Sequence, residues 1–127
     1  MTMSIEGRGR AVGPREPHAP VTEGVAPVHV VCRLAGDLDL DRVGSARAAL
    51  DEALSPHTDW LIVDLAAVTF CDSSGLNLLL QTRLTAERAG TGMRLAAVPE
   101  PMKRLLEITG ASAVFPQYAT VDAALQG

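Results

Sequence analysis

The stretch Thr69–Leu80 reads T-F-C-D-S-S-G-L-N-L-L-L and places two hydroxyls and a carboxylate between two apolar runs. Serines in such a place can act as nucleophiles, as helix caps or as acceptors of a phosphate. A nucleophile elbow needs Gly-x-Ser-x-Gly, but the residue two before Ser73 is Cys71 and the residue two before Ser74 is Asp72. Neither serine has a base nearby in the sequence. We therefore expect no enzyme activity and assign no catalytic residue.

The stretch Asp72–Gly75 also suits the first turn of a helix. Side-chain oxygens of Asp and Ser accept hydrogen bonds from the free amides there, and Gly tolerates tight geometry. One such oxygen is enough, yet three are present. A capping box is absent, because Leu76 follows Ser73 by three residues and Asn77 follows Ser74 by three. At least one hydroxyl is therefore spare, at a helix N-terminus whose amides and dipole favour a phosphate.

Other kinds of site find little support. His18, His29 and His57 lie far apart without ligand spacing, so no metal site is expected. The sequence contains neither G-x-G-x-x-G nor a Walker lysine, so we expect no cofactor. A formal net charge of −4 with 3% aromatic residues argues against nucleic acid as a partner. Cys32 and Cys71 lie in apolar surroundings without C-x-x-C spacing, which indicates reduced thiols. With no apolar run of about 18 residues, we expect no membrane segment and a cytoplasmic location.

Strands and helices are expected to alternate, which indicates an α/β fold. Apolar periodicity predicts helices over 42–54, 76–89, 101–109 and 121–125. Gly90 should follow the second helix, and Thr120 should cap the last one. The first strand is expected to begin at Val28 and to be followed by a turn at Gly36-Asp37. Further strands are expected at 60–65, 93–98 and 114–115, with a brief turn before Val68.

Residues 1–27 differ from the remainder of the chain. They are rich in Gly, Pro, Arg, Glu and Ala and have no sustained apolar period. Four prolines interrupt any regular element, at Pro14, Pro17, Pro20 and Pro27. We therefore expect residues 1–27 to be a flexible N-terminal tail and residues 28–127 to be one domain.

Three blocks of the sequence together resemble a known family. They read G-D-L-D-L at 36–40, L-I-V-D-L-A-A-V-T-F-C-D-S-S-G-L at 61–76 and M-K-R-L-L-E-I-T-G at 102–110. In this order and spacing they resemble the STAS domain of anti-sigma factor antagonists, over roughly Val28 to Leu125. The resemblance implies a single α/β domain with a mixed β-sheet of four to five strands and four helices packed mainly on one side.

The resemblance also implies a regulatory mechanism. An unphosphorylated antagonist of this family binds an anti-sigma factor that is itself a serine kinase, and thereby frees a sigma factor. The kinase phosphorylates the first serine of the motif, here Ser73, and the complex dissociates until a phosphatase restores the active form. Asp72 would then flank and orient Ser73, while Ser74 and Gly75 would shape the start of the helix.

The partner-binding surface implied by the resemblance has seven residues. They are Asp37, Asp39, Asp72, Ser73, Ser74, Gly75 and Asn77. An alternative role for the same kind of domain is a STAS scaffold or small-ligand sensor module in a larger regulatory assembly. A phosphate on Ser73 would favour the antagonist, and a large stable assembly would favour the scaffold.

Overall fold

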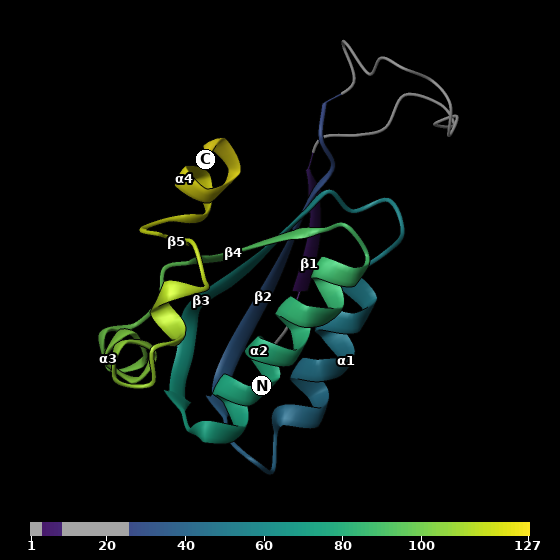
Figure 1. The fold of residues 1–127 in the computed structure, drawn as a ribbon. Coiled ribbons are helices and arrows are strands. Elements are labelled where there is room, and N and C mark those ends of the chain that lie inside the picture. The colour runs from purple at the N-terminus through teal and green to yellow at the C-terminus, as the bar shows by residue number, and fades with distance from the viewer. Residues whose placement is uncertain (1–3, 9–25) are drawn as a thin grey trace.

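The structure is a computed structural model that describes the backbone of residues 4–8 and the whole of residues 26–127. Within these residues the chain forms one five-stranded sheet and four helices (Figure 1). The strands, in their order across the sheet, are β1 (Ser4–Arg8), β2 (His29–Leu38), β3 (Trp60–Cys71), β4 (Gly92–Ala96) and β5 (Gln117–Tyr118). The helices are α1 (Val43–Ala53), α2 (Ser73–Arg88), α3 (Glu100–Ile108) and α4 (Val121–Gln126), with a short 3-10 helix at Ala111–Ala113. Strand β1 is antiparallel to β2, and all other neighbours are parallel.

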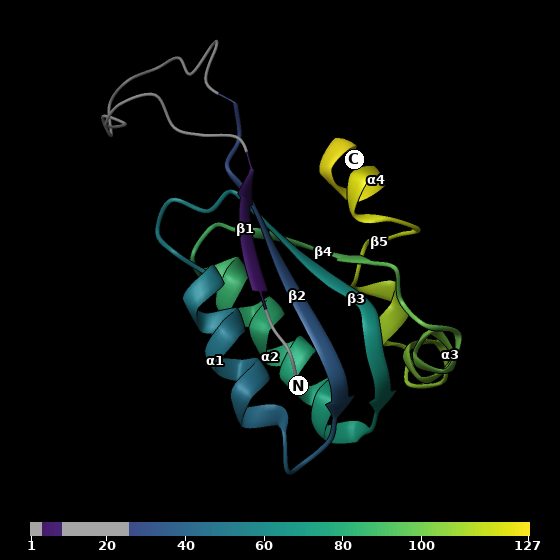
Figure 2. The ribbon, with the colours of Figure 1, turned by 180° about the vertical axis from the view of Figure 1, so that it is seen from behind.

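The sheet has two faces that are covered differently. Alternate side chains of the strands point to opposite faces, and Cys32, Leu34 and Val63 enter the main core with the apolar sides of α1, α2 and α3. The opposite face carries a smaller cluster in which Val31, Ile62 and Ala96 pack against Ala124 of α4. Figures 1 and 2 show α1 and α2 together on one side of the sheet. The expected mixed α/β fold is confirmed, with α4 on the second face.

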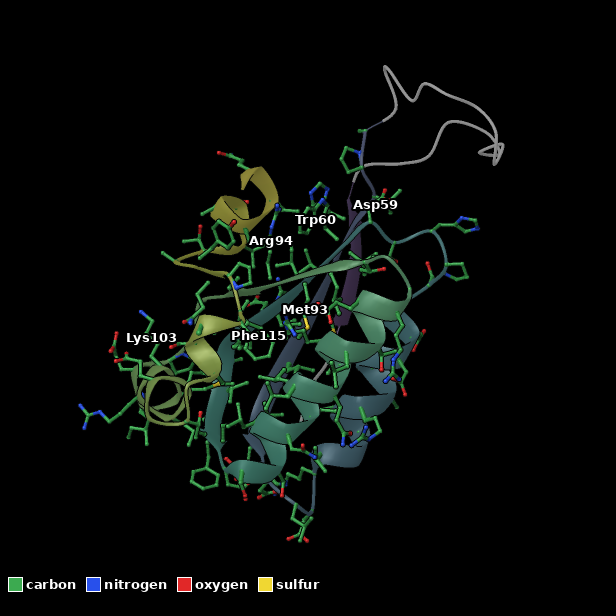
Figure 3. All side chains as sticks on the ribbon, viewed as in Figure 1. Asp59, Trp60, Met93, Arg94, Lys103 and Phe115 are labelled. Carbon is green, nitrogen blue, oxygen red and sulfur yellow. The ribbon has the colours of Figure 1, made fainter. Side chains whose placement is uncertain are left out.

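Helix α4 is attached to the sheet by an arginine. The guanidinium of Arg94 stacks over the ring of Trp60, 3.6 Å from its centroid, and donates a hydrogen bond of 2.8 Å to the carbonyl of Ala124 (Figure 3). Both side chains come from neighbouring parallel strands. The stack and the hydrogen bond together fix α4 over the second face, away from the end of the sheet where α2 begins.

Strands β2 and β3 are longer than the sequence suggested. The expected turns at Gly36-Asp37 and before Val68 are wrong, because both segments stay within the strands. The pairing instead shifts twice, between Arg33 and Ala35 and between Gly36 and Asp37, and each time β3 gains one extra residue. Gly36 adopts a φ of 81°, which glycine tolerates without strain. Bulges of this kind absorb turn-like residues without ending a strand.

The expected start of the ordered part of the chain is also corrected. Order was expected to begin at Val28, yet Ser4–Arg8 forms the edge strand β1 and pairs with residues 29–33. Backbone pairing to a neighbouring strand needs no strong local pattern, so this strand could not be recognised from the sequence. Of the other residues of the expected tail, 1–3 and 9–25 lie outside the described part, and residues 26 and 27 are exposed and in no helix or strand.

The strand expected at 114–115 lies at Gln117–Tyr118 instead. Phe115 is buried, as its apolar character predicted, but it reaches the core from a loop. Pro116 follows it and has no amide to donate to a strand, so the pairing with β4 begins one residue later.

The signals at the ends of three helices were interpreted correctly, although α2 begins at Ser73, three residues before the expected start. Gly90 and Gly110 follow α2 and α3 with φ values of 76° and 79°, and Thr120 caps α4 by accepting a hydrogen bond of 3.0 Å from the amide of Ala123. In the described part of the chain, no helix combines the length and the apolar character needed to cross a bilayer.

Candidate functional site

Asp72 is the residue that caps α2. One oxygen of its carboxylate, Oδ1, accepts hydrogen bonds from the amides of Ser74 at 2.8 Å and Gly75 at 3.4 Å. Its backbone is extended, so the helix begins at the next residue, Ser73. A single side chain therefore satisfies two of the free amides of the first turn.

The two serines of the motif take no part in this cap. Within residues 26–127, neither the hydroxyl of Ser73 nor that of Ser74 makes a hydrogen bond. Ser73 is exposed and Ser74 is half-buried. The sequence predicted at least one spare hydroxyl, and the structure leaves both spare, with Ser73 the more accessible.

Gly75 holds the start of α2 against the end of β2. A Cβ atom built on Gly75 would lie 2.6 Å from the carbonyl oxygen of Leu38 and 2.8 Å from the sulfur of Cys71. Atoms cannot approach so closely without displacement, so only glycine fits. The amide of Asp72 donates to the same Leu38 carbonyl at 3.3 Å. The position of Ser73 is thus fixed by backbone contacts on both sides of it in the sequence.

The two aspartates around Leu38 lie at this end of the sheet as well. Asp37 accepts a hydrogen bond of 2.7 Å from the hydroxyl of Thr69, and its other oxygen is 3.6 Å from the guanidinium of Arg42. Asp39 accepts one of 3.1 Å from the amide of Arg42 in the turn that leads into α1. Asp37 is therefore in β2, and Asp39 is in the turn that follows.

The seven residues expected to face a partner are brought together by these contacts. Leu38, which Asp37 and Asp39 flank, contacts the segment Asp72–Gly75. Asn77 is exposed and lies four residues after Ser73, on the same side of α2. The role of this surface in binding a partner stays a prediction.

The thiol of Cys71, next to the motif, is unsuited to act as a nucleophile or a metal ligand. Burial, assisted by the charge of Asp72, raises the pKa of Cys71 to about 11. Burial, assisted by Glu52, likewise raises the pKa of Cys32 to about 11. Both cysteines are free, and both stay protonated near neutral pH. No group of three or more His, Cys, Asp or Glu among the described residues is arranged to hold a metal ion.

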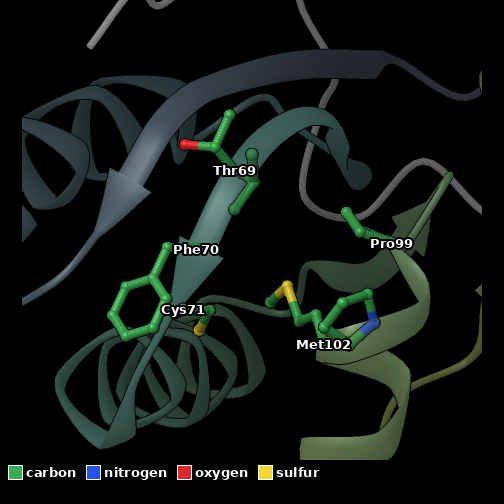
Figure 4. Close-up of a pocket in the computed structure, with 7 residues that line it drawn as sticks. Thr69, Phe70, Cys71, Pro99 and Met102 are labelled. Carbon is green, nitrogen blue, oxygen red and sulfur yellow. The ribbon is translucent and has the colours of Figure 1, made fainter.

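An apolar groove beside the motif is a feature that the sequence did not reveal. It lies between the end of β3 and the start of α3, has a volume of about 120 Å³, and is lined by Val68, Thr69, Phe70, Cys71, Pro99, Pro101 and Met102 (Figure 4). Phe70 belongs to an apolar run, so the sequence offered no reason to place it outside the core. The second bulge inserts Thr69 between paired residues and leaves Phe70 54% exposed.

Comparisons with known proteins agree on one family. Residues 16–124 match the STAS domain. The anti-sigma F factor antagonist of Paenibacillus polymyxa is 30% identical over 90 residues, which cover 70% of this chain and 77% of that protein. An anti-sigma factor antagonist from Mycobacterium paratuberculosis has a similar structure, with a TM-score of 0.70, 25% identity, and coverage of 97% of this chain and 92% of that one.

A third relative, SpoIIAA, is known in two forms. The unphosphorylated anti-sigma factor antagonist SpoIIAA gives a TM-score of 0.65 at 26% identity, over 76% of this chain and 84% of that one. Phosphorylated SpoIIAA of Bacillus gives a TM-score of 0.61 at 26% identity, over 77% of this chain and 88% of that one. The chain therefore belongs to the STAS domain family, and its resemblance to the anti-sigma factor antagonists of that family is confirmed. These relatives are named for antagonism of another protein, which is a regulatory role and not a catalytic one.

Proposed function

We propose that this protein is an anti-sigma factor antagonist whose unphosphorylated form binds an anti-sigma factor with serine kinase activity, and so releases a sigma factor. Phosphorylation of Ser73 by that kinase ends the complex, and a phosphatase restores binding. The observation that carries the proposal is the exposed hydroxyl of Ser73, which starts α2 and has no hydrogen bond within residues 26–127. Since sigma factors act on cytoplasmic RNA polymerase, the proposal includes a cytoplasmic location.

The place of Ser73 in the helix suits a phosphate. At a helix N-terminus the amides and the dipole stabilise negative charge by roughly 0.3–1 kcal/mol. A phosphate would add about −1.5 to −2 charges beside the carboxylate of Asp72. The cap does not depend on the Ser73 hydroxyl, because Asp72 supplies both of its hydrogen bonds. Phosphorylation should therefore change the surface and leave the fold intact, as a binding switch requires.

The relatives support a switch of this kind. SpoIIAA has the same fold in its unphosphorylated and phosphorylated forms, with TM-scores of 0.65 and 0.61 against this chain. A fold that persists in both states restricts the effect of the phosphate to the surface that a partner contacts. The expected change in affinity is large: a 10³-fold loss corresponds to about 4 kcal/mol. Placing a dianion against an acidic or desolvated partner surface can cost this much.

The proposal can be tested by following the complex while the kinase acts. The wild-type chain and Ser73→Ala are each mixed with the purified anti-sigma factor, its sigma factor and ATP. We expect the wild-type chain to release the sigma factor at first and then to dissociate as phosphate accumulates. Ser73→Ala should release the sigma factor and stay bound. Equal lifetimes of the two complexes in ATP would contradict the proposal.

Ser74→Ala is the matched control for this experiment. Its hydroxyl is as free of hydrogen bonds as that of Ser73 among the described residues, but it is half-buried. We expect Ser74→Ala to dissociate in ATP as the wild-type chain does. A persistent complex with Ser74→Ala and a transient one with Ser73→Ala would move the switch to Ser74.

A further inference from the structure

Phe70 is an unusual residue on this surface. The chain has only two phenylalanines. Phe115 is 3% exposed in the core, whereas Phe70 is 54% exposed at the end of β3. A large aromatic ring gains little by facing water, and exposed apolar groups that lie together often mark a contact with another protein.

Phe70 does not stand alone. It borders the groove between β3 and α3, here called the Phe70 groove, whose lining residues were given above. Figure 4 shows Cys71 of β3 between Phe70 and Met102 of α3. Six of the seven lining residues are apolar, and the polar one, Thr69, already gives its hydroxyl to Asp37. The groove therefore offers room for an apolar group and few free polar partners.

The Phe70 groove lies within reach of any protein that covers Ser73. Phe70 precedes Ser73 by three residues, a span of at most about 10 Å in an extended chain. A standard interface buries about 800 Å² on each partner, equal to a disc of radius about 16 Å. Leu40 is 75% exposed in the turn after β2 and lies two residues beyond Leu38, which contacts the motif. An interface centred on Ser73 thus covers exposed apolar groups from the turn after β2 and from the end of β3.

We propose that the Phe70 groove receives an apolar side chain of the anti-sigma factor, and that the ring of Phe70 is the anchor of this contact. The inference rests on the proposed function and adds the chemistry by which the partner is recognised. It also supplies a reason for release. A phosphate on Ser73 would lie beside an apolar contact from which water is excluded, where a dianion is costly.

The first test compares two exposed apolar residues. Phe70→Ala should weaken binding of the purified anti-sigma factor about 30-fold, which corresponds to about 2 kcal/mol at a buried aromatic anchor. Leu84→Ala is the control, because Leu84 is 47% exposed on α2 and lies about 16 Å from Ser73 along the helix, at the rim of such an interface, where truncation of a side chain changes the affinity little. Its affinity should match that of the wild-type chain. Wild-type affinity in Phe70→Ala, with an unchanged thermal midpoint, overturns the inference.

A second measurement needs no substitution. The chain labelled with ¹³C at its methionine methyl groups reports on two described core residues, Met102, which also lines the groove, and Met93, which does not. On addition of the anti-sigma factor we expect the Met102 signal to shift while that of Met93 stays in place. An unmoved Met102 signal in a fully bound sample overturns the inference. A shift that depends on the concentration of the isolated chain would identify a second copy as the occupant and would also overturn it.

These outcomes separate the inference from the proposed function. In one case, the anti-sigma factor binds the wild-type chain and phosphorylates Ser73, while Phe70→Ala keeps the wild-type affinity and the Met102 signal does not move. The proposed function then stands, and the groove has no role in it. If the wild-type chain is neither bound nor phosphorylated by any anti-sigma factor kinase of its own cell, the proposed function fails first. Tight binding of the wild-type chain and of Leu84→Ala, with weakened binding of Phe70→Ala, supports both the proposed function and the inference.

Discussion

The first turns of α1 and α2 lie at the same end of the sheet but are built differently. Helix α1 starts after Arg42 without a side-chain cap, and a Cβ on Gly44 would meet nothing within 4 Å. Helix α2 is capped by Asp72, and Gly75 is pressed against Leu38. The start of α1 is thus an ordinary exposed turn, whereas the start of α2 is held by several contacts.

This difference bears on how a kinase would meet Ser73. Each of the two turns carries an exposed serine, Ser45 in α1 and Ser73 in α2. Only Ser73 is fixed by a capping carboxylate and a close backbone contact on its two sides. A partner that binds the folded surface therefore finds the Ser73 hydroxyl in a constant position. Three matched pairs of substitutions test whether the contrast between the turns is real.

The largest expected effect comes from placing a charge in each turn. Ser73→Asp should weaken binding of the anti-sigma factor by about 100-fold, or about 2.7 kcal/mol, because the carboxylate would enter the partner-binding surface. Ser45→Asp adds the same charge to the first turn of α1 and should bind like the wild-type chain. Isothermal titration calorimetry measures both affinities. Equal losses in the two variants would mean that net charge, and not the position of Ser73, controls binding.

The second pair compares the two glycines. Gly75→Ala should lower the free energy of unfolding by about 1–3 kcal/mol, because the new methyl group overlaps Leu38 and Cys71. Gly44→Ala has open space around it and should raise the stability by up to about 1 kcal/mol, since alanine is the better helix former. Urea unfolding followed by circular dichroism gives both values. A Gly75→Ala variant as stable as the wild-type chain would show that the start of α2 can shift to accommodate the methyl group.

The third and smallest effect concerns the two aspartates that receive backbone amides. Asp72→Ala should cost about 1 kcal/mol of stability, the usual value for loss of a cap. Asp39→Ala removes one exposed hydrogen bond to Arg42 and should cost no more than about 0.5 kcal/mol. Asp72→Asn keeps a capping oxygen and should restore most of the loss. The same urea experiment applies, and a larger loss for Asp39→Ala than for Asp72→Ala would reverse the comparison.

The helices and the order of the elements could be predicted from the sequence because their signals are local. The apolar period of α2 and the glycines after α2 and α3 each concern a few neighbouring residues. Strand β1 and the bulges of β3 could not be predicted, since they depend on pairing with β2. The error at 114–115 has the same origin: Phe115 is apolar enough for a strand, but Pro116 delays the pairing with β4.

The candidate site was predicted in part for similar reasons. Asp72–Gly75 contains three side chains with a capping oxygen, although one is enough to cap a helix. A spare hydroxyl could therefore be expected from the residues alone. Which oxygen caps α2 depends on the extended backbone of Asp72, and the sequence left that open. The choice of Ser73 over Ser74 came from the family resemblance. The Phe70 groove was missed because it combines β3 and α3, which are distant in the chain.

The central claim is that Ser73 is the phosphate acceptor, and site mapping tests it most directly. The chain is incubated with the purified anti-sigma factor kinase and ATP, and its intact mass and fragments are measured by mass spectrometry. We predict one phosphate per chain, on Ser73, and none on Ser73→Ala. A phosphate that maps to Ser74, or a chain that binds the kinase and stays unphosphorylated, would contradict the claim.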